Sequence, residues 1–392
     1  MKLLLIISAI LFVSSTSNAQ LSSGMKPQEA KDMIALCNSF TYLELYGDDS
    51  EIIPSNYKKV YTSPVLGMDN KFQVYVNNRT NIGVINFRGS TSKKISWMEN
   101  MHSALIPVEG EISIQNRVYK YKYGTDPASL IHSGYALSLA YLHDDLIEQV
   151  IQLNNKGIYN IILTGHSQGG ALAIMLGAYL KHSDEVSNKN RFKLYTFAQP
   201  MSGNFEFTKE FNRDYCARGM SFSFINPEDL VPTLPLAYND TTFIKESLIN
   251  LVTGKEPIDK TDLLTEGLKV LLADKLKPTA AKFGASIENQ IRQEMGNITL
   301  PKPSGEINFS QVGNITHLLP PEYPLELKDP SVMNDPEFLR THPRKNGVFE
   351  DKSVYKKVSM AQHHKPYNYY TGILRKYFPS EYKTVNPKSF GL

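Results

Sequence analysis

One short segment, IILTGHSQGGALA at residues 161–173, restricts the fold of this chain more than any other feature. It sets Ser167 between Gly165 and Gly169, after an apolar run that suits a parallel strand buried on both faces. Glycines at these positions allow tight packing of the strand against the helix that follows. The segment therefore predicts a strained turn that presents the Ser167 hydroxyl as a nucleophile. The alternative is a glycine-rich turn with a capping serine.

The same turn indicates how negative charge on a reacting carbonyl oxygen is stabilised. The helix after the turn directs the positive end of its dipole toward Ser167, and the backbone N–H of Gln168 can donate to an oxyanion. Such a serine needs a base, and the base needs an orienting carboxylate. In folds with this turn, both partners follow the serine along the chain.

The candidate acid lies in the segment FSFINPEDLVPTLP, residues 222–235. A strand predicted over 221–226 ends at Pro227. Asp229 therefore falls on the loop at the carboxyl end of that strand, where open α/β sheets place their functional residues. Glu228 is the neighbouring competitor, and a solvated acidic turn is the alternative interpretation.

Histidines near the carboxyl end of the chain are the candidates for the base: His317, His342, His363 and His364. His317 lies in an alternating, strand-like run, and His342 lies in a charged loop before a proline, so both are weaker candidates. The other two precede an aromatic-rich helix. We favour His364, with His363 as the alternative.

Composition and the first residues indicate an exported globular protein. The 392 residues are 41% hydrophobic and 21% charged, with a net charge of +3, and no basic run with interleaved aromatics indicates a nucleic-acid partner. Lys2, an apolar core at residues 3–13 and small residues before Ala19 are typical of a signal peptide cleaved after Ala19. A buried amino-terminal strand is the alternative. No later segment is long and apolar enough for a transmembrane helix, so we expect a secreted or periplasmic protein.

The two cysteines, Cys37 and Cys216, leave the question of a disulfide open. An oxidising compartment favours pairing, but the sequence does not give the distance between their Cα atoms. Neither cysteine has the spacing of a metal site.

In this order, the motifs resemble those of the class 3 lipases, the fungal-type triacylglycerol lipases and their relatives within the α/β hydrolases. The resemblance spans roughly residues 28–370. The matching blocks are VINFRGSTS (84–92), IHSGY (131–135), TGHSQGGALA (164–173), YTFAQPMSGN (195–204), NPEDLVPTLP (226–235) and HHKPYNYY (363–370).

This resemblance implies an α/β-hydrolase fold, with a central, mostly parallel sheet flanked by helices. It implies that Ser167 is the nucleophile, Asp229 the orienting acid and His364 the base. It also implies that Ser90 and Gln168 form the oxyanion hole. The sequence departs from the family at Ser96, where an aspartate is usual before the lid tryptophan, and this puts the anchoring of the lid in doubt.

The resemblance further implies a lid between the first two blocks, within KKISWMENMHSALIP at residues 93–107. Apolar residues recur there at roughly helical spacing: Ile95, Trp97, Met98, Met101 and Leu105. A short amphipathic helix would cover the serine in water and open against lipid. The alternative is an ordinary surface helix packed on the core.

We expect a single domain over residues 20–392 with a helical insertion at about 239–310. The segment TDLLTEGLKVLLADKLKP, residues 261–278, has leucines on one helical face, and a second helix is predicted over 283–295. Because the insertion leaves the loop of Asp229, we interpret it as a cap over the active site. A peripheral decoration is the alternative.

These observations predict a secreted serine ester hydrolase that acts through an acyl-enzyme, with no metal or other cofactor. The expected substrate is triacylglycerol or another carboxylic ester, met at a transient contact with a lipid interface. The alternatives are a phospholipase A or acyltransferase with the same triad, and a non-catalytic lipid-binding module.

Overall fold

The computed structural model describes residues 21–235, 280–305, 308–356, 358 and 360–385. The predicted signal peptide and the predicted helix at 261–278 lie outside the described residues. The second predicted helix of the insertion is present as α8, Ala280–Met295.

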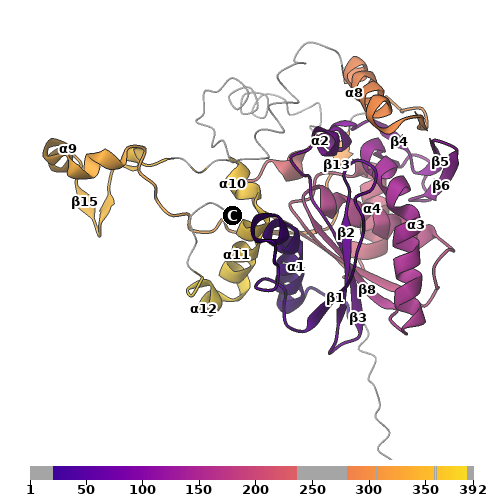
Figure 1. The fold of residues 1–392 in the computed structure, drawn as a ribbon, viewed down its shortest axis with the longest axis horizontal. Coiled ribbons are helices and arrows are strands. Elements are labelled where there is room, and N and C mark those ends of the chain that lie inside the picture. Colours follow the sequence, from indigo (N-terminus) through magenta and orange to yellow (C-terminus); the bar gives the residue numbers. More distant parts are fainter. Residues whose placement is uncertain (1–20, 236–279, 306–307, 357, 359, 386–392) are drawn as a thin grey trace, which may run out of the picture.

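A seven-stranded sheet forms the centre of the molecule, in the order β1-β2-β3-β8-β9-β11-β14 (Figure 1). The strands from β3 to β14 in this order run parallel, while β1 and β2 join one edge antiparallel. The predicted, mostly parallel sheet is therefore confirmed. The strands are β1 Tyr57–Thr62, β2 Phe72–Asn77, β3 Ile82–Phe87, β8 Asn160–His166, β9 Arg191–Phe197, β11 Ser221–Ile225 and β14 Asn314–His317.

Helices cover both faces of the sheet because its strands are apolar on both faces. Ile161 and Leu163 of β8 pack with α3 (Ser133–Asn155) and α4 (Gln168–His182) in one core. Ile162, on the opposite face of the same strand, belongs to a second core with α1 (Pro27–Tyr46) and α11 (Pro366–Tyr377). This three-layer arrangement is the α/β-hydrolase fold that the motifs predict, with the carboxyl ends of the parallel strands meeting at one edge.

Smaller elements surround the carboxyl edge of the sheet. Helix α2 (Lys94–Met101) follows β3 and contacts both α3 and α8. Two further sheets have the orders β13-β10-β7-β4 and β12-β5-β6. Their strands are β4 Leu105–Pro107, β5 Glu109–Ile114, β6 Arg117–Lys122, β7 Leu130–His132, β10 Gly203–Asn204, β12 Ile298–Thr299 and β13 Phe309–Ser310. The short helices α5 Phe205–Phe211 and η1 Asn212–Cys216 follow β10, and η2 Val231–Thr233 follows β11.

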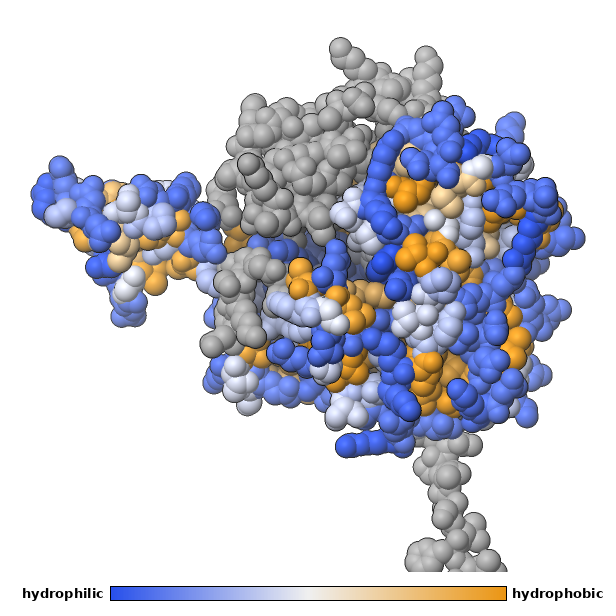
Figure 2. All heavy atoms as spheres, in the orientation of Figure 1, coloured by the Kyte–Doolittle hydropathy of each residue, from blue (hydrophilic) through white to orange (hydrophobic). Residues whose placement is uncertain are grey.

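An arm of residues 326–356 stands away from the body, which the sequence did not predict (Figure 1). Backbone bonds between residues 326–328 and 354–356 close its base. Its elements are η3 Pro330–Asn334, α9 Pro336–Thr341, β15 Arg344–Lys345, β16 Val348–Phe349 and η4 Lys352–Val354. After the arm, the chain returns to the body through α10 Met360–His364, and the last described helix is α12 Pro379–Tyr382. Figure 2 shows mainly hydrophilic residues on the arm, with an apolar patch on one side.

The sequence leaves a disulfide between the two cysteines open and predicts no transmembrane helix after the signal peptide. Cys37 and Cys216 are both free and buried, so they form no disulfide. The Cys37 thiol lies 3.7 Å from the Thr164 hydroxyl, whereas the Cys216 thiol bonds to Asn212. Among the described residues, no helix has the length and apolar character needed to cross a membrane.

Candidate active site

The nucleophile candidate sits on a strained turn that requires glycines on both sides of it. Ser167 joins β8 to α4 with φ 59° and ψ −134°, a strained conformation that costs roughly 1–3 kcal/mol. A Cβ added to Gly165 would lie 2.2 Å from backbone atoms of Gly169, and one added to Gly169 would lie 2.4 Å from the carbonyl oxygen of Phe87. The glycines at 165 and 169 therefore let the strand, the turn and β3 pack closely enough to hold Ser167 in place.

Ser167, His364 and Asp229 form a continuous hydrogen-bonded chain at the carboxyl edge of the sheet. His364 Nε2 lies 2.8 Å from Ser167 Oγ, and His364 Nδ1 lies 2.8 Å from Asp229 Oδ2. Because an ionised carboxylate only accepts hydrogen bonds, Nδ1 carries the proton and Nε2 accepts from the serine hydroxyl. All three side chains are buried, so little water competes for these bonds. The structure thus brings together three residues that the sequence places far apart.

Asp229 is held by two further donors. The backbone N–H of Val231 donates to Oδ1 at 2.9 Å, and the Tyr369 hydroxyl donates to Oδ2 at 2.7 Å. The backbone N–H of Asn226 in turn donates to the Tyr369 hydroxyl at 3.1 Å. Burial, followed by the charge of Asp229, raises the pKa of Tyr369 well above its usual value, so the hydroxyl keeps its proton. Tyr369 belongs to the aromatic-rich helix that the sequence predicts after His364, and its contact with Asp229 was not predicted.

The competing candidates do not reach Ser167. Glu228 is exposed beside the buried Asp229. His363 Nδ1 lies 3.1 Å from the hydroxyl of Tyr323, and the two rings pack edge to face. His317 is exposed at the end of β14, and His342 stacks on an aromatic ring of the arm.

His166, the residue before the nucleophile, also lies against the histidine of the chain. Its ring centre is 4.7 Å from that of His364. Burial, and then the neighbouring His364, lower the pKa of His166 well below its usual value. His166 is therefore neutral and adds no positive charge beside the imidazolium that forms on His364 during proton transfer.

The two residues expected at the oxyanion hole lie beside the nucleophile. A Cβ on Gly89 would lie 3.0 Å from the carbonyl oxygen of His166 and 3.5 Å from Ser167 Cβ, so the loop of Gly89 and Ser90 runs directly against the turn. The Ser90 hydroxyl donates to the side-chain oxygen of Gln168 at 2.7 Å. Gln168 is the first residue of α4, so its backbone N–H has no acceptor within the helix.

The segment expected to form a lid is the helix α2. Trp97 and Met98 are buried, and Ile95 and Met101 are partly buried against the same core. The structure therefore shows a helix seated on the body, as the alternative interpretation described. The opening of α2 as a lid stays a prediction.

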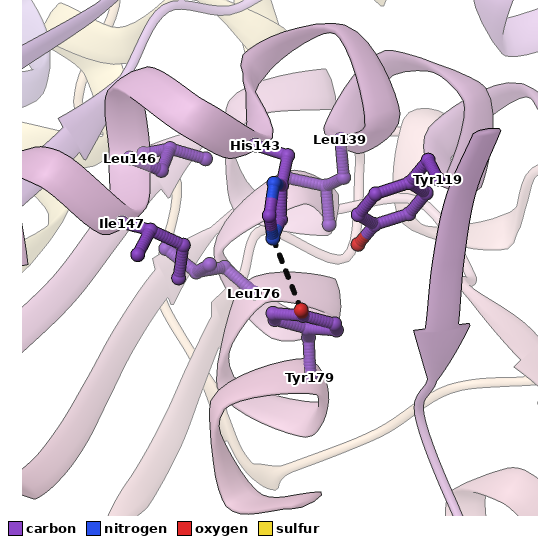
Figure 3. A pocket seen from close by; sticks show the side chains of 7 residues that line it. All are labelled: Tyr119, Leu139, His143, Leu146, Ile147, Leu176 and Tyr179. Carbon is purple, nitrogen blue, oxygen red and sulfur yellow. Dashed lines mark hydrogen bonds between the residues drawn. The ribbon is translucent and has the colours of Figure 1, made fainter. Parts of the chain in front are cut away.

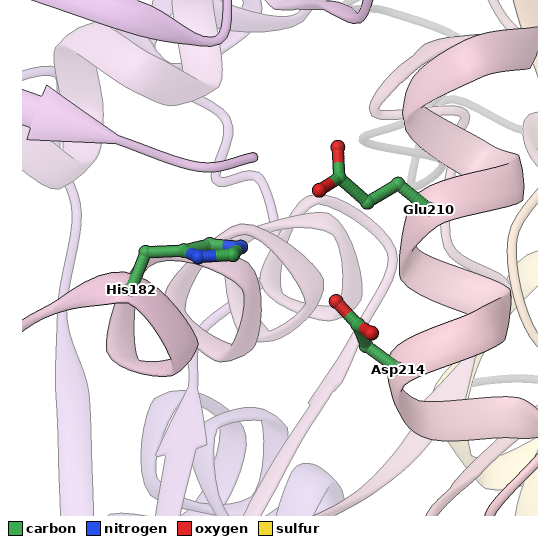
Figure 4. Close-up of side chains that lie close together, drawn as sticks. All are labelled: His182, Glu210 and Asp214. Atoms are coloured by element: carbon green, nitrogen blue, oxygen red, sulfur yellow. The ribbon is translucent and has the colours of Figure 1, made fainter. Parts of the chain in front are cut away.

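A second cluster of polar side chains, away from Ser167, has a structural explanation. Figure 4 shows His182 facing Glu210 and Asp214, whose ligand-type atoms lie within 4.8 Å of one another. The Glu210 carboxylate already accepts bonds from the backbone N–H groups of Thr125 and Asp126, at 2.8 and 3.2 Å, and from the Thr125 hydroxyl. Glu210 thus fastens the loop before β7.

A small pocket lies between α3, α4 and β6, apart from the serine (Figure 3). Two of its polar residues are His143 and Tyr179, whose Nε2 and hydroxyl lie 3.0 Å apart. None of its lining residues belongs to the chain of Ser167: Tyr119, Leu139, His143, Leu146, Ile147, Leu176 and Tyr179.

Comparison with known proteins finds a match to one protein family and similarity to several lipases. Residues 84–239 match the family described as Lipase (class 3). Lipase ZK262.3 of Caenorhabditis elegans is 32% identical over 111 residues, which is 28% of this chain and 29% of the relative. Secreted mono- and diacylglycerol lipase 1 of Fusarium solani is 21% identical over 60% of this chain and 71% of its own length. The lipase of Rhizomucor miehei is 27% identical over 38% of this chain and 37% of its own length.

Solved structures of fungal lipases are also similar to the chain. A Rhizomucor miehei lipase propeptide complex gives a TM-score of 0.41 at 23% identity and covers 56% of this chain and 67% of that one. A fungal lipase–inhibitor complex gives a TM-score of 0.42 at 23% identity, covering 54% and 75%. The matched region spans about a third of the length of the Caenorhabditis elegans and Rhizomucor miehei lipases and 71% of the Fusarium solani lipase.

Proposed function

We propose that this chain, whose residues 84–239 match the class 3 lipase family, is a serine ester hydrolase that forms an acyl-enzyme on Ser167. The observation that carries the proposal is the hydrogen-bonded chain from Ser167 through His364 to Asp229. A serine on a strained turn, a histidine whose Nε2 faces its hydroxyl and a buried carboxyl group behind the histidine together suit acyl transfer.

In the proposed reaction, His364 Nε2 takes the proton of Ser167 as Oγ attacks the ester carbonyl carbon. The backbone N–H groups of Ser90 and Gln168 donate to the oxyanion of the tetrahedral intermediate. His364 then gives its proton to the leaving alcohol, and the acyl group stays on Oγ. Water, deprotonated by His364, attacks this acyl ester, and the second intermediate collapses to the free acid and the serine. Asp229 stabilises the imidazolium in both halves of the cycle.

The proposed substrates are lipid esters, triacylglycerol or other carboxylic esters, because the similar proteins are named as lipases. We propose that the protein is exported through the signal peptide predicted at residues 1–19, as one of these relatives is named as secreted. The rest of the chain is proposed to be one domain, with the insertion at about 239–310 as a cap and α2 as a lid at a lipid interface.

The test compares the mature chain from residue 20 with its Ser167→Ala variant on p-nitrophenyl esters from acetate to palmitate, below and above substrate solubility. The change should lower kcat by up to about 10⁶-fold. Ser133→Ala is the matched control, since the Ser133 hydroxyl also lies 2.7 Å from a histidine nitrogen, His102 Nδ1, at the start of α3. Activity in the wild type and control, but not in Ser167→Ala, is the expected result.

Equal rates in all three proteins, or no rate in any, would remove the hydrolase proposal and favour a lipid-binding module. A rate that rises on emulsified long chains supports a lipase, whereas a preference for short soluble esters supports an esterase without a lid. Product analysis with a phospholipid, and with an acceptor alcohol present, assigns phospholipase or acyltransferase activity to the same serine.

A further inference from the structure

We infer that Glu99 of α2 is a positioning residue, which fixes the oxyanion-hole residue Gln168 through a buried hydrogen bond and so joins α2 to the oxyanion hole. The inference rests on the proposed function, because it assigns the purpose of the contact to stabilising an oxyanion. It concerns the geometry of Gln168, and Glu99 itself touches no reacting atom.

Glu99 is a fully buried carboxyl group without a cationic neighbour. Its Oε2 atom accepts from Gln168 Nε2 at 2.9 Å and from Asn70 Nδ2 at 2.8 Å. In the part of the chain that the structure describes, it forms no ion pair with a lysine, arginine or histidine. Burying a carboxyl group without a salt bridge costs folding free energy. The presence of Glu99 at this position therefore needs an explanation, and its bonds to Gln168 and Asn70 supply one.

The side chain of Gln168 is completely satisfied, which fixes its orientation. Its Nε2 donates to Glu99 and to Asn70 Oδ1, the latter at 3.0 Å. Its Oε1 accepts from the Ser90 hydroxyl at 2.7 Å and from Asn100 Nδ2 at 2.8 Å. An amide with both donors and both lone pairs engaged cannot rotate without losing several bonds. The backbone N–H of the same residue, which faces the oxyanion, is therefore held in one position.

Helix α2 contributes two of these partners, and it is itself fastened to α3. Asn100 also donates to Ser90 Oγ at 3.0 Å, so α2 bonds to both oxyanion-hole residues. A Cβ on Gly134 would lie 2.0 Å from the carbonyl oxygen of Glu99, which shows how closely α2 and α3 approach there. Rigid displacement of α2 would break the bonds to Gln168 and Ser90 together.

The contact also suits the charge that develops in the reaction. Burial raises the pKa of Glu99 to about 8, although the hydrogen bond from Asn70 lowers it in part. A neutral carboxyl group can orient Gln168 without placing a negative charge near the oxyanion, which an ionised carboxylate would oppose. Glutamine offers the same neutral acceptor and donor in the same shape.

The test compares Glu99→Leu and Glu99→Gln with a control, Leu137→Ala, which creates a cavity at a buried residue of α3 and removes none of the hydrogen bonds of Gln168. Glu99→Leu should lower kcat by about 100-fold, because a shift of about 1 Å at a catalytic group has an effect of this size. KM should change by less than about threefold, because no substrate contact is lost. Glu99→Gln should keep kcat close to that of the wild type.

Hydrogen–deuterium exchange gives a second readout that does not depend on activity. Peptides covering residues 86–92 and 165–171 should lose protection in Glu99→Leu and keep it in Glu99→Gln and Leu137→Ala. An active wild type with unchanged kcat in folded Glu99→Leu would overturn the inference, as would an equal loss of kcat in Leu137→Ala. An inactive wild type with the same exchange pattern would refute the proposed function and leave the link between Glu99 and Gln168 standing.

Discussion

Replacing Glu99 by glutamine should remove a large pH dependence from the stability of the protein. The carboxyl group of Glu99 is fully buried, and its pKa is raised from 4.5 in water to about 8 by loss of hydration. The group therefore keeps its proton in the folded chain at pH values where the unfolded chain has released it. Glutamine has the same shape and no titration, so the difference between the two proteins isolates this one group.

The direction of the effect follows from proton binding. Between pH 4.5 and about 8, the folded state holds one more proton at Glu99 than the unfolded state, so raising the pH favours unfolding. Below that window the group has no effect on the free energy of unfolding. Relative to pH 4, the loss of stability is about 3 kcal/mol at pH 7 and about 5 kcal/mol at pH 9.

The assay is urea unfolding of the wild type and Glu99→Gln at pH 4, 5.5, 7 and 9. The free energy of unfolding of the wild type should fall relative to the variant by about 3 kcal/mol between the first and third conditions. Buried His102 and His132, whose pKa values burial lowers to about 4 and about 3, destabilise both proteins equally in acid and cancel in the comparison. Tyr135 is the titratable neighbour on α3, and its raised pKa keeps it neutral across this range. Parallel stability curves for the two proteins would refute the reasoning.

Two further changes test the histidine and its support. Tyr369→Phe removes the donor to Asp229 and leaves the buried N–H of Asn226 without a partner, so kcat should fall by about tenfold and the unfolding free energy by about 1–3 kcal/mol. Steady-state rates and urea unfolding measure these effects, and an unchanged kcat would show that Tyr369 only stabilises the fold. His364→Gln should lower kcat by several orders of magnitude, whereas His363→Gln should keep it within about threefold, because only His364 contacts the nucleophile. The reverse ranking in the same ester assay would move the base to His363.

Much of the fold could be predicted from local sequence patterns. The turn around Ser167 was predictable because its glycines, apolar strand and small-residue helix are contiguous, and their packing depends on neighbours within a few positions. Strands β8 and β11 were predictable from similar local signals, whereas the mostly parallel sheet was predicted from the resemblance to the class 3 lipases. The arm at 326–356 was not predicted, because its polar sequence resembles an ordinary loop and its short elements carry little periodicity.

The contacts that support the site were harder to predict from the sequence. Tyr369 reaches Asp229 across 140 positions, and Glu99 reaches Gln168 across 69. In the sequence, Tyr369 fits the apolar face of a helix and Glu99 fits a solvated position beside Trp97. Only the packing of α11 and α2 in the folded chain reveals that Tyr369 and Glu99 are buried and that both bond to residues of the site.

These contacts also bear on how α2 could act at an interface. A lid that uncovers Ser167 by swinging α2 away would release the side chain of Gln168 and weaken the oxyanion hole at the same moment. Opening is compatible with activity only if the bonds of Glu99 and Asn100 stay intact or are replaced. A motion limited to Ile95 and the residues before it satisfies this condition, because the buried bonds to Gln168 begin at Glu99, beyond that point in the helix. Trp97 lies between the two parts, so its fluorescence on adding lipid vesicles separates whole-helix movement, which exposes the indole, from movement of the first turn, which leaves it buried.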